Sequence, residues 1–563
     1  MSINTLAKRR IAPAKEGLVE KFYLFLRNHA LLVLTLLTLS LIVVYINPFH
    51  ETAISDDWAY ILTSRHLYYT GQYNLHDWSS ANIMFQAYWG ALFTLVGGFS
   101  IGTLHISTLV LLVIGIFSLY LLAQEHGLDR RMAGVLSFCL VGNPLVIFLM
   151  LTFMTDVPAL ALLIAGLLLY TRGLKRQSLS YMLAAGLVTV GATFIRPTAL
   201  ALLLGLGVIF WLDKARLNRW KLYLAGSIFP FLGGLFLVFG GTSATFNNGA
   251  PNSSGQIQYM THLDVFLPNV FLWRPDTFLI YLGFFSAPLV LGAIVGLLSG
   301  KSKRLKLNPK VVAGFSLLVL GALCYNIFVL KGDWTLPYIG FNLEALTSLP
   351  LLGGLATIIA VPGGIIIGVI TWERVGSLAH WRAIPLEQRF LDTVSVFMLL
   401  YHLVFFGVAE RYLFVLLPFT FIVMGRYIQP LFGKLYHLII VSSFVVVIIT
   451  AMITRFFQAE QAAEWEASNY TLTLGATPLK VFGPWGWYSS YNYADYKSHN
   501  PNKANNGYIS DVWLPQRKSE ANYLITNYKE ELTENGWQVI KTISYSDPLF
   551  QNRLVYVLKR VGI

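Results

Sequence analysis

The chain has 563 residues, of which 55% are apolar and 12% are charged, against roughly 45–50% and 25% in soluble domains. A mean hydropathy of +0.59 excludes a single soluble globule, and so large an apolar fraction also excludes disorder. The remaining class is a membrane protein with several spans. The formal net charge of +13 would raise nucleic-acid binding in a soluble chain, so its meaning depends on where the basic residues lie.

Thirteen apolar segments are long enough, allowing for tilt, to cross a hydrocarbon core of about 30 Å. We therefore predict an all-α polytopic membrane domain over residues 29–453, with a short N-terminal segment (1–28) before it. The first apolar segment lacks a cleavage site and is expected to remain as an anchor. The predicted span cores are 29–46, 104–123, 132–150, 157–171, 180–193, 197–212, 222–240, 278–298, 311–330, 350–370, 391–408, 412–424 and 436–453.

The basic residues alternate between successive loops, as the positive-inside rule requires. With residues 1–28 in the cytoplasm, loops on that side hold 25 of the 41 Lys and Arg, and the tail after residue 453 holds 11. The alternation holds if residues 83–98 form an amphipathic or re-entrant helix on the outer face. The charge therefore maps topology in a plasma-membrane protein, with no nucleic-acid partner. The five basic residues of the outside loops are Arg65, Arg196, Arg274, Lys331 and Arg411.

Two regions are predicted to lie outside, namely the first external loop (47–103) and the tail (454–563). In the tail, the apolar spacing over residues 517–534 predicts a helix. The alternating runs WQVIKTISY and RLVYVLKRV predict two strands. A small extracytoplasmic α/β domain fits this tail.

Charged side chains near membrane depth are costly and usually functional. Asp56 and Asp57 follow the first span, and Asp156 lies in the outside turn between the third and fourth spans. Arg196 occupies the next outside turn, and Arg411 lies in the last one before the tail. The topology therefore predicts that acidic and basic groups converge at the outer mouth of the bundle.

This convergence predicts sugar transfer from a polyprenyl phosphate to an extracytoplasmic hydroxyl or amine. Such a reaction needs a carboxylate to orient and deprotonate the acceptor, and guanidinium groups to stabilise the leaving phosphate. The candidate catalytic carboxylates are Asp56, Asp57 and Asp156. The candidate phosphate-binding residues are Arg65, Arg196, Arg411 and Tyr412, and the accessory candidates are Tyr60, His66, His262 and Glu410. The carboxylates also leave Mg²⁺ or Mn²⁺ open as a cofactor.

Structural roles compete with these assignments. Asp56 and Asp156 are suited to capping helices, and Arg196 and Arg411 to snorkelling toward lipid headgroups. His402 lies in an apolar segment and is expected to serve packing or a structural hydrogen bond. The aromatic stretch 484–496 fits either sugar stacking or an interfacial belt.

The motifs together resemble the multi-spanning C-type glycosyltransferases, specifically the dolichyl-phosphate-mannose protein mannosyltransferase-like group, which includes the lipid A aminoarabinose transferases. The resemblance covers about residues 29 to 425. It is carried by Asp56-Asp57-x-x-Tyr60 with Gly71-x-Tyr73, by Phe85 to Gly98, by Thr155-Asp156-Val157-Pro158, by Arg196-Pro197, and by Arg411-Tyr412 with Pro418.

This resemblance implies a C-type (GT-C) fold and a polyprenyl-phosphate sugar donor. Our leading hypothesis is an inverting transfer of the sugar to a lipid, protein or polysaccharide acceptor. The resemblance also implies that Asp56 or Asp57 acts as base, that Asp156 assists, and that Arg411 lies near the donor phosphate. The chain departs from the lipid A enzymes at residues 80–85, where SANIMF replaces their lysine-containing pattern. Lipid A is therefore not assigned as the acceptor.

Two further classes are compatible with the same residues. A transporter or flippase of a lipid-linked or anionic solute would be expected to show paired repeats and charges at the bilayer midplane. A polysaccharide polymerase or ligase would also use a polyprenyl carrier. The identity of the sugar and of the acceptor does not follow from the sequence.

Overall fold

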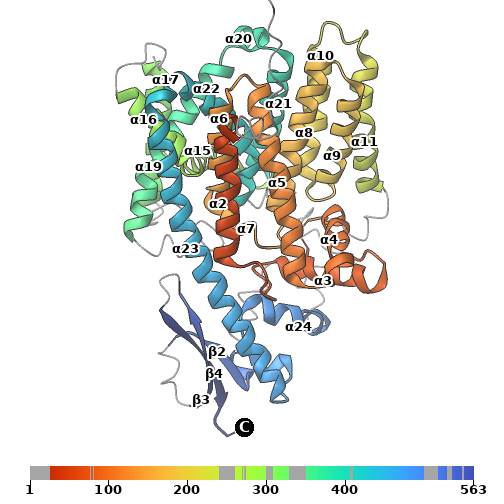
Figure 1. Ribbon diagram of the computed structural model, residues 1–563, viewed down its shortest axis with the longest axis vertical. Coiled ribbons are helices and arrows are strands. Elements are labelled where there is room, and N and C mark those ends of the chain that lie inside the picture. The colour runs from red at the N-terminus through yellow and green to blue at the C-terminus, as the bar shows by residue number, and fades with distance from the viewer. Residues whose placement is uncertain are drawn as a thin grey trace, which may run out of the picture.

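The computed structural model describes residues 26–76, 78–79, 81–239, 260–268, 270–271, 274–298, 308–328, 350–405, 410–499, 518–528, 536–547 and 551–562. Most of the predicted cytoplasmic segment 1–28 lies outside these residues. A bundle of helices forms one end of the elongated molecule, and a small sheet with helix α24 forms the other (Figure 1). The predicted fold class, a helical membrane domain with a C-terminal α/β domain, is thus confirmed.

The bundle is built from helices throughout the chain. Its first half contains α2 (Ala30–Ile46), α3 (Asp57–Thr70), α4 (Met84–Gly97), α5 (Ile101–Glu125), α6 (Arg130–Val141), α7 (Pro144–Leu149), α8 (Asp156–Arg176), α9 (Leu179–Thr193), η1 (Pro197–Leu200), α10 (Ala201–Leu212) and α11 (Trp220–Phe239). The second half contains α14 (Leu263–Pro268), α15 (Arg274–Phe285), α16 (Ala287–Leu298), α17 (Pro309–Phe328), α19 (Pro350–Val375), α20 (Leu378–Ala383), α21 (Leu386–Val404), η3 (Glu410–Leu416), α22 (Leu417–Ile428), η4 (Gln429–Leu431) and α23 (Phe432–Thr473).

Each predicted apolar segment contains helix, but two are divided. Segment 132–150 breaks into α6 and α7 at Asn143, whose side chain accepts a hydrogen bond from Leu145 N at 3.0 Å and so caps α7. Segment 278–298 bends by 91° between α15 and α16. Among the described residues, six helices are long and apolar enough to cross a membrane, or seven if the bent pair is one span. The number of thirteen spans therefore stays a prediction.

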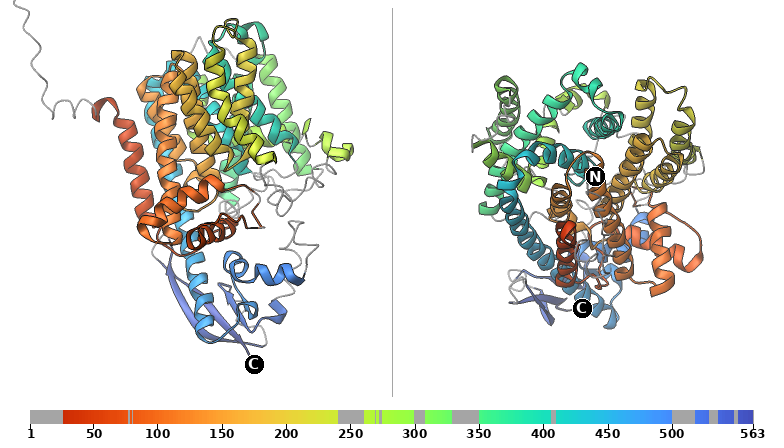
Figure 2. Two further views of the ribbon diagram at one scale, coloured as in Figure 1. Left: turned by 90° about the vertical axis from the view of Figure 1, so that its right-hand side faces the viewer. Right: turned by 45° about the horizontal axis from the view of Figure 1, so that its top comes forward.

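The described loops among those predicted to face the cytoplasm gather at the end of the bundle away from the sheet (Figure 1). There Glu125, at the end of α5, pairs with Arg172 at 2.9 Å and with Lys175 and Arg176 at 3.1 Å, all at the end of α8. α2 also begins at this end (Figure 2). The alternation of basic loops therefore corresponds to the two ends of one bundle.

Helices α3 and α4 lie across the opposite end of the bundle (Figure 2). α4 ends at Gly97 and is followed by its C-cap Gly98, whose φ of +77° is a conformation that favours glycine. Buried Gln86 of α4 donates to Phe153 O at 2.8 Å and so fixes α4 against the segment that precedes α8. Residues 83–98 thus form a separate helix, as the sequence predicts.

The C-terminal region combines helices with a four-stranded sheet. Its strands β1 (Val481–Phe482), β2 (Tyr523–Thr526), β3 (Trp537–Ser546) and β4 (Asn552–Arg560) have the order β1-β2-β4-β3. β1 and β2 are parallel, and the other pairs are antiparallel. The short helix η5 (Pro478–Lys480) precedes β1, and α24 (Trp485–His499) follows it. The predicted boundary after residue 453 falls inside α23, which continues from the bundle to the sheet (Figure 1).

The two strands predicted from alternation are confirmed as β3 and β4, but the helix predicted over residues 517–534 is wrong at residues 521–528, and residues 529–534 lie outside the described residues. Tyr523–Thr526 forms the inner strand β2, and all four residues are buried. A strand that is buried on both faces lacks the polar alternation that distinguishes a strand from a helix in sequence.

The crossing of α15 and α19 depends on glycine. A Cβ at Gly283 would meet Ala360 O and Gly364 N, whereas Gly314 on α17 faces open space. We expect Gly283→Ala to lower stability by about 1–3 kcal/mol because of overpacking, and Gly314→Ala to have no such effect. Apparent melting temperatures in detergent measure both. Equal melting temperatures for the two variants would contradict the close crossing.

Candidate active site

Asp57 lies at the start of α3 and is fully buried. Its Oδ1 accepts a hydrogen bond from Ile54 N at 2.6 Å, and its Oδ2 accepts one from Phe153 N at 3.1 Å. Burial raises the pKa of this carboxyl to about 8, although the two backbone N–H groups act in the opposite direction. Both oxygens of Asp57 therefore hold the first external loop against the segment that precedes α8.

Asp56 precedes α3 and is partly exposed. It occupies the N-cap position but makes no capping hydrogen bond. Instead its Oδ1 accepts from the indole Nε1 of Trp78 at 3.1 Å. The carboxylate is thus held by a side chain from the loop between α3 and α4, so capping does not explain it.

Asp156 forms a buried ion pair with Arg196. Arg196 Nη2 lies 2.8 Å from Asp156 Oδ1, and Arg196 Nε donates to Thr155 Oγ1 at 2.9 Å. The Asp156 side chain is 0% exposed and that of Arg196 15%. The Oδ2 atom of Asp156 is buried and has no hydrogen-bond partner among the described residues. Arg196 therefore points inward rather than toward lipid headgroups.

The ring of Tyr412 contacts two guanidinium groups. The Cζ atoms of Arg196 and Arg411 lie 5.1 Å and 5.6 Å from the centre of its ring, within the range of cation–π contact. Arg411 is also buried and interacts electrostatically with Asp156, Asp56 and Tyr60. The fold thus brings together six residues predicted from sequence, which are Asp56, Tyr60, Asp156, Arg196, Arg411 and Tyr412.

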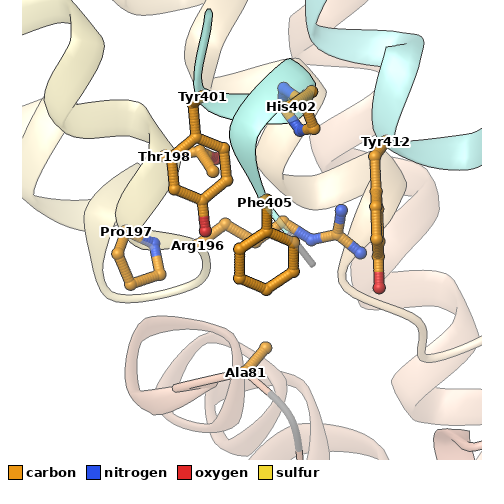
Figure 3. Close-up of a pocket in the computed structure, with 8 residues that line it drawn as sticks. All are labelled: Ala81, Arg196, Pro197, Thr198, Tyr401, His402, Phe405 and Tyr412. Atoms are coloured by element: carbon orange, nitrogen blue, oxygen red, sulfur yellow. The ribbon is translucent and has the colours of Figure 1, made fainter. Parts of the chain in front are cut away.

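A pocket of about 90 Å³ opens beside Arg196 and Tyr412 (Figure 3). The sequence predicted those two residues but not the rest of its lining. Tyr401 and His402 come from the last turn of α21, where this polar aromatic pair interrupts an apolar run that continues through Phe406. The remaining lining residues are Ala81, Pro197, Thr198 and Phe405.

The end of α21 is fixed by Arg274, the first residue of α15. Its Nη1 donates to Leu403 O at 2.7 Å and also to the carbonyls of His402 and Phe405. Carbonyls at a helix end lack intrahelical donors. Arg274 supplies the missing donor and so fixes this side of the pocket. The ring of His402 bonds to Met398 O at 2.7 Å; it has the expected structural bond and also lines the pocket.

Other predicted residues are not brought into this group. Arg65 is exposed and lies over the ring of Tyr69 at 5.9 Å. In the described part of the chain, no hydrogen bond or ion pair connects Arg65, His66 or His262 to the acidic and basic groups above, and His262 is exposed. The side chain of Glu410 lies outside the described residues. Their assignments stay predictions.

The sequence allowed Mg²⁺ or Mn²⁺ as a cofactor but did not decide between a metal-dependent and a metal-independent site. Over the described residues, three or more His, Cys, Asp or Glu side chains do not gather in a group that could hold a metal ion. A requirement for Mg²⁺ or Mn²⁺ is therefore a question for the assay below.

Comparison with known proteins agrees with the resemblance inferred from sequence. The family described as dolichyl-phosphate-mannose-protein mannosyltransferase matches residues 83–238, which include α4, Asp156 and Arg196. The resemblance is confirmed over this part of the chain. No curated protein matches the chain in sequence.

Solved structures give low-identity matches. ArnT from Cupriavidus metallidurans bound to undecaprenyl phosphate is 11% identical, with a TM-score of 0.48 over 96% of this chain and 99% of that chain. The archaeal oligosaccharyltransferase AglB from Archaeoglobus fulgidus, in complex with an inhibitory peptide and a dolichol-phosphate, is 12% identical, with a TM-score of 0.45 over 90% and 70%.

The buried carboxyl of Asp57 predicts a pH dependence of stability. Its pKa is about 8 in the folded protein and about 3.9 in an unfolded chain, so folding takes up a proton between these values. Asp57 therefore makes its full contribution to the free energy of unfolding below about pH 4. That contribution decreases as the pH rises and no longer changes above about pH 8. Melting temperatures from pH 5 to 9 should therefore fall in the wild type relative to Asp57→Asn. A constant difference between the two proteins would contradict this.

The ion pair of Asp156 gives a second prediction. Arg196→Met leaves a buried carboxylate without its partner, which costs about 3–5 kcal/mol. The double variant Arg196→Met with Asp156→Leu removes the buried charge and should recover much of this loss. Denaturation of the wild type, both single variants and the double variant measures the coupling. Additive losses would show that the pair is not coupled.

Proposed function

We propose that this protein is an integral membrane glycosyltransferase that moves a sugar from a polyprenyl-phosphate donor to an acceptor outside the cytoplasm. The family match over residues 83–238 supports this class. The observation that carries the proposal is that two guanidinium groups, Arg196 and Arg411, both contact the ring of Tyr412, and that Arg196 and Tyr412 line a pocket. Buried guanidinium groups in a fixed position are suited to an anionic phosphate.

The reaction proposed is a direct displacement at the anomeric carbon. The acceptor oxygen or nitrogen forms a bond to that carbon as the bond from carbon to phosphate oxygen breaks, so the configuration inverts. The electron pair of the broken bond stays on the polyprenyl phosphate, whose charge Arg411 and Arg196 stabilise. The acceptor proton passes to Asp56. Asp56 is suited to this role because it is partly exposed and interacts electrostatically with Arg411.

The other two carboxylates have different proposed roles. Asp156 is buried and paired with Arg196, so it orients that guanidinium toward the pocket. Asp57 uses both oxygens on backbone groups and therefore positions its neighbour Asp56. In this proposal the partly exposed Asp56 is catalytic, and the buried Asp57 and Asp156 are positioning residues.

In the membrane, the proposed orientation places the N-terminus in the cytoplasm and the sheet domain outside. The loops rich in Lys and Arg lie at the end away from the sheet, which agrees with the positive-inside rule. The pocket and Asp56 then face the outer leaflet, where a lipid, protein or polysaccharide acceptor is available.

Transfer by purified protein in lipid nanodiscs tests the proposal. The donors are radiolabelled polyprenyl-phosphate sugars, tried one at a time, and the acceptor is a cell-envelope fraction from the source organism. Asp56→Asn is expected to lower kcat at least 10²-fold, within the range for loss of a general base. Asp129→Asn is the matched control, since Asp129 caps α6 at the other end of the bundle and Asn caps equally well.

Full transfer by Asp56→Asn would contradict the role of that residue. Movement of the donor across liposomes without a covalent product would favour the flippase alternative. Mass spectrometry of the product separates one added sugar from a polymer. Parallel assays with EDTA, Mg²⁺ and Mn²⁺ decide the metal requirement.

A further inference from the structure

The C-terminal region reaches the first external loop through a cluster of aromatic rings. Trp78 lies 5.7 Å from Trp485 and 6.0 Å from Tyr493, measured between ring centres. Trp485 and Tyr493 belong to α24, and Tyr493 also contacts Trp58 at 5.6 Å and His76 at 4.9 Å. Rings at these separations interact favourably beyond their burial. Helix α24 therefore fixes the indole of Trp78 from the side of the sheet domain.

The backbone of α24 also lies directly against the loop before Asp56. A Cβ at Gly486 would lie 2.9 Å from Ala53 O, which is closer than real Cβ atoms approach such an oxygen. Ala53 and Ile54 are both buried. The helix and this loop therefore form one packed unit, with no side chain of residue 486 between them.

Trp78 has two separate sets of partners. Its ring packs on α24 and also lies 6.1 Å from the ring of Trp58 on α3, while its Nε1–H donates to Asp56 Oδ1 at 3.1 Å. Hydrogen bonds to a charged acceptor are stronger than neutral ones and fix its direction. The indole of Trp78 holds the carboxylate of Asp56, and α24 holds the indole. Asp56 therefore has few orientations open to it.

We propose that Trp78 is a positioning residue for Asp56 and that α24 of the C-terminal region acts on the site through it. The proposal rests on the function proposed above, because it concerns the orientation of the same carboxylate. Trp485 acts on Asp56 by holding the Trp78 ring, so it has no effect of its own once the indole N–H is gone. The C-terminal region is then a part of the catalytic apparatus rather than an appended domain.

The test uses the full chain in nanodiscs and the variants Trp78→Phe, Trp485→Ala and their combination. Phe keeps an aromatic ring but has no N–H. Trp89→Phe is the matched control, because Trp89 Nε1 donates at 2.9 Å to a backbone carbonyl, Ser107 O, instead of a carboxylate. The first readout is the labelling of Asp56 by a carbodiimide and an amine, followed by mass spectrometry. The second is the initial rate of transfer at varied donor concentration with the cell-envelope acceptor fraction.

We expect Asp56 to be labelled several-fold faster in Trp78→Phe, in Trp485→Ala and in the double variant, and at the wild-type rate in Trp89→Phe. We expect kcat to fall about tenfold or more, the range for loss of a hydrogen bond to a charged group, with the KM for donor unchanged. The double variant should be no worse than Trp78→Phe, since the two residues act in series.

Wild-type labelling of Asp56 in Trp78→Phe would overturn the inference, and so would additive losses in the double variant. Labelling does not require turnover, so it tests the inference even where transfer is absent. Asp56→Asn, measured in parallel, tests the proposed function instead. An inactive Asp56→Asn with a fully active Trp78→Phe would remove the role of Trp78 and leave the function standing.

Discussion

The arrangement of the site depends on the carboxyl group of Asp57. It accepts backbone N–H groups from two segments that are about one hundred residues apart in sequence, at Ile54 and at Phe153. The first segment leads directly to Asp56, and the second leads directly to Asp156. A single buried side chain therefore sets the distance between the residue proposed to act as base and the carboxylate proposed to hold a phosphate-binding guanidinium.

The same contact explains why a costly buried acid is retained. Burial raises the pKa of Asp57, and a buried acid with a raised pKa lowers the stability of the protein at neutral pH. Each of its oxygens, however, accepts a hydrogen bond from a backbone N–H group that would otherwise be buried without a partner. Asp156 follows a similar logic, because its ion pair with Arg196 is needed once both are inside. Burial of these two acidic residues lowers the stability of the protein and fixes the orientation of the charged groups.

Part of this site was predictable from the sequence. Asp56, Asp156, Arg196 and Arg411 are charges beside apolar runs, and counting spans places them at one end of the bundle. The sequence did not predict Trp78 or Tyr401, because aromatic residues are common at membrane interfaces and their partners are distant in the chain. It also did not distinguish buried Asp57 from partly exposed Asp56, since adjacent residues share the same sequence signal and differ only in tertiary packing.

The fold shows the same division. Apolar length predicted the helices, but it did not predict the 91° bend between α15 and α16, which lies at Ser286, just before Pro288 in the first turn of α16. The prediction failed at β2, because four buried residues fit a helix as well as an inner strand. The local sequence pattern distinguishes a short strand from a helix where one face is polar. It does not distinguish them where both faces are buried, as in β2.

A structure of the full chain with a polyprenyl phosphate bound in a nanodisc tests the central claim most directly. The account predicts the phosphate within hydrogen-bonding distance of the guanidinium groups of Arg411 or Arg196, beside Tyr412 and at the same end of the bundle as Asp56. A phosphate bound at the end near Glu125, or elsewhere with Arg196 and Arg411 unchanged, would contradict it.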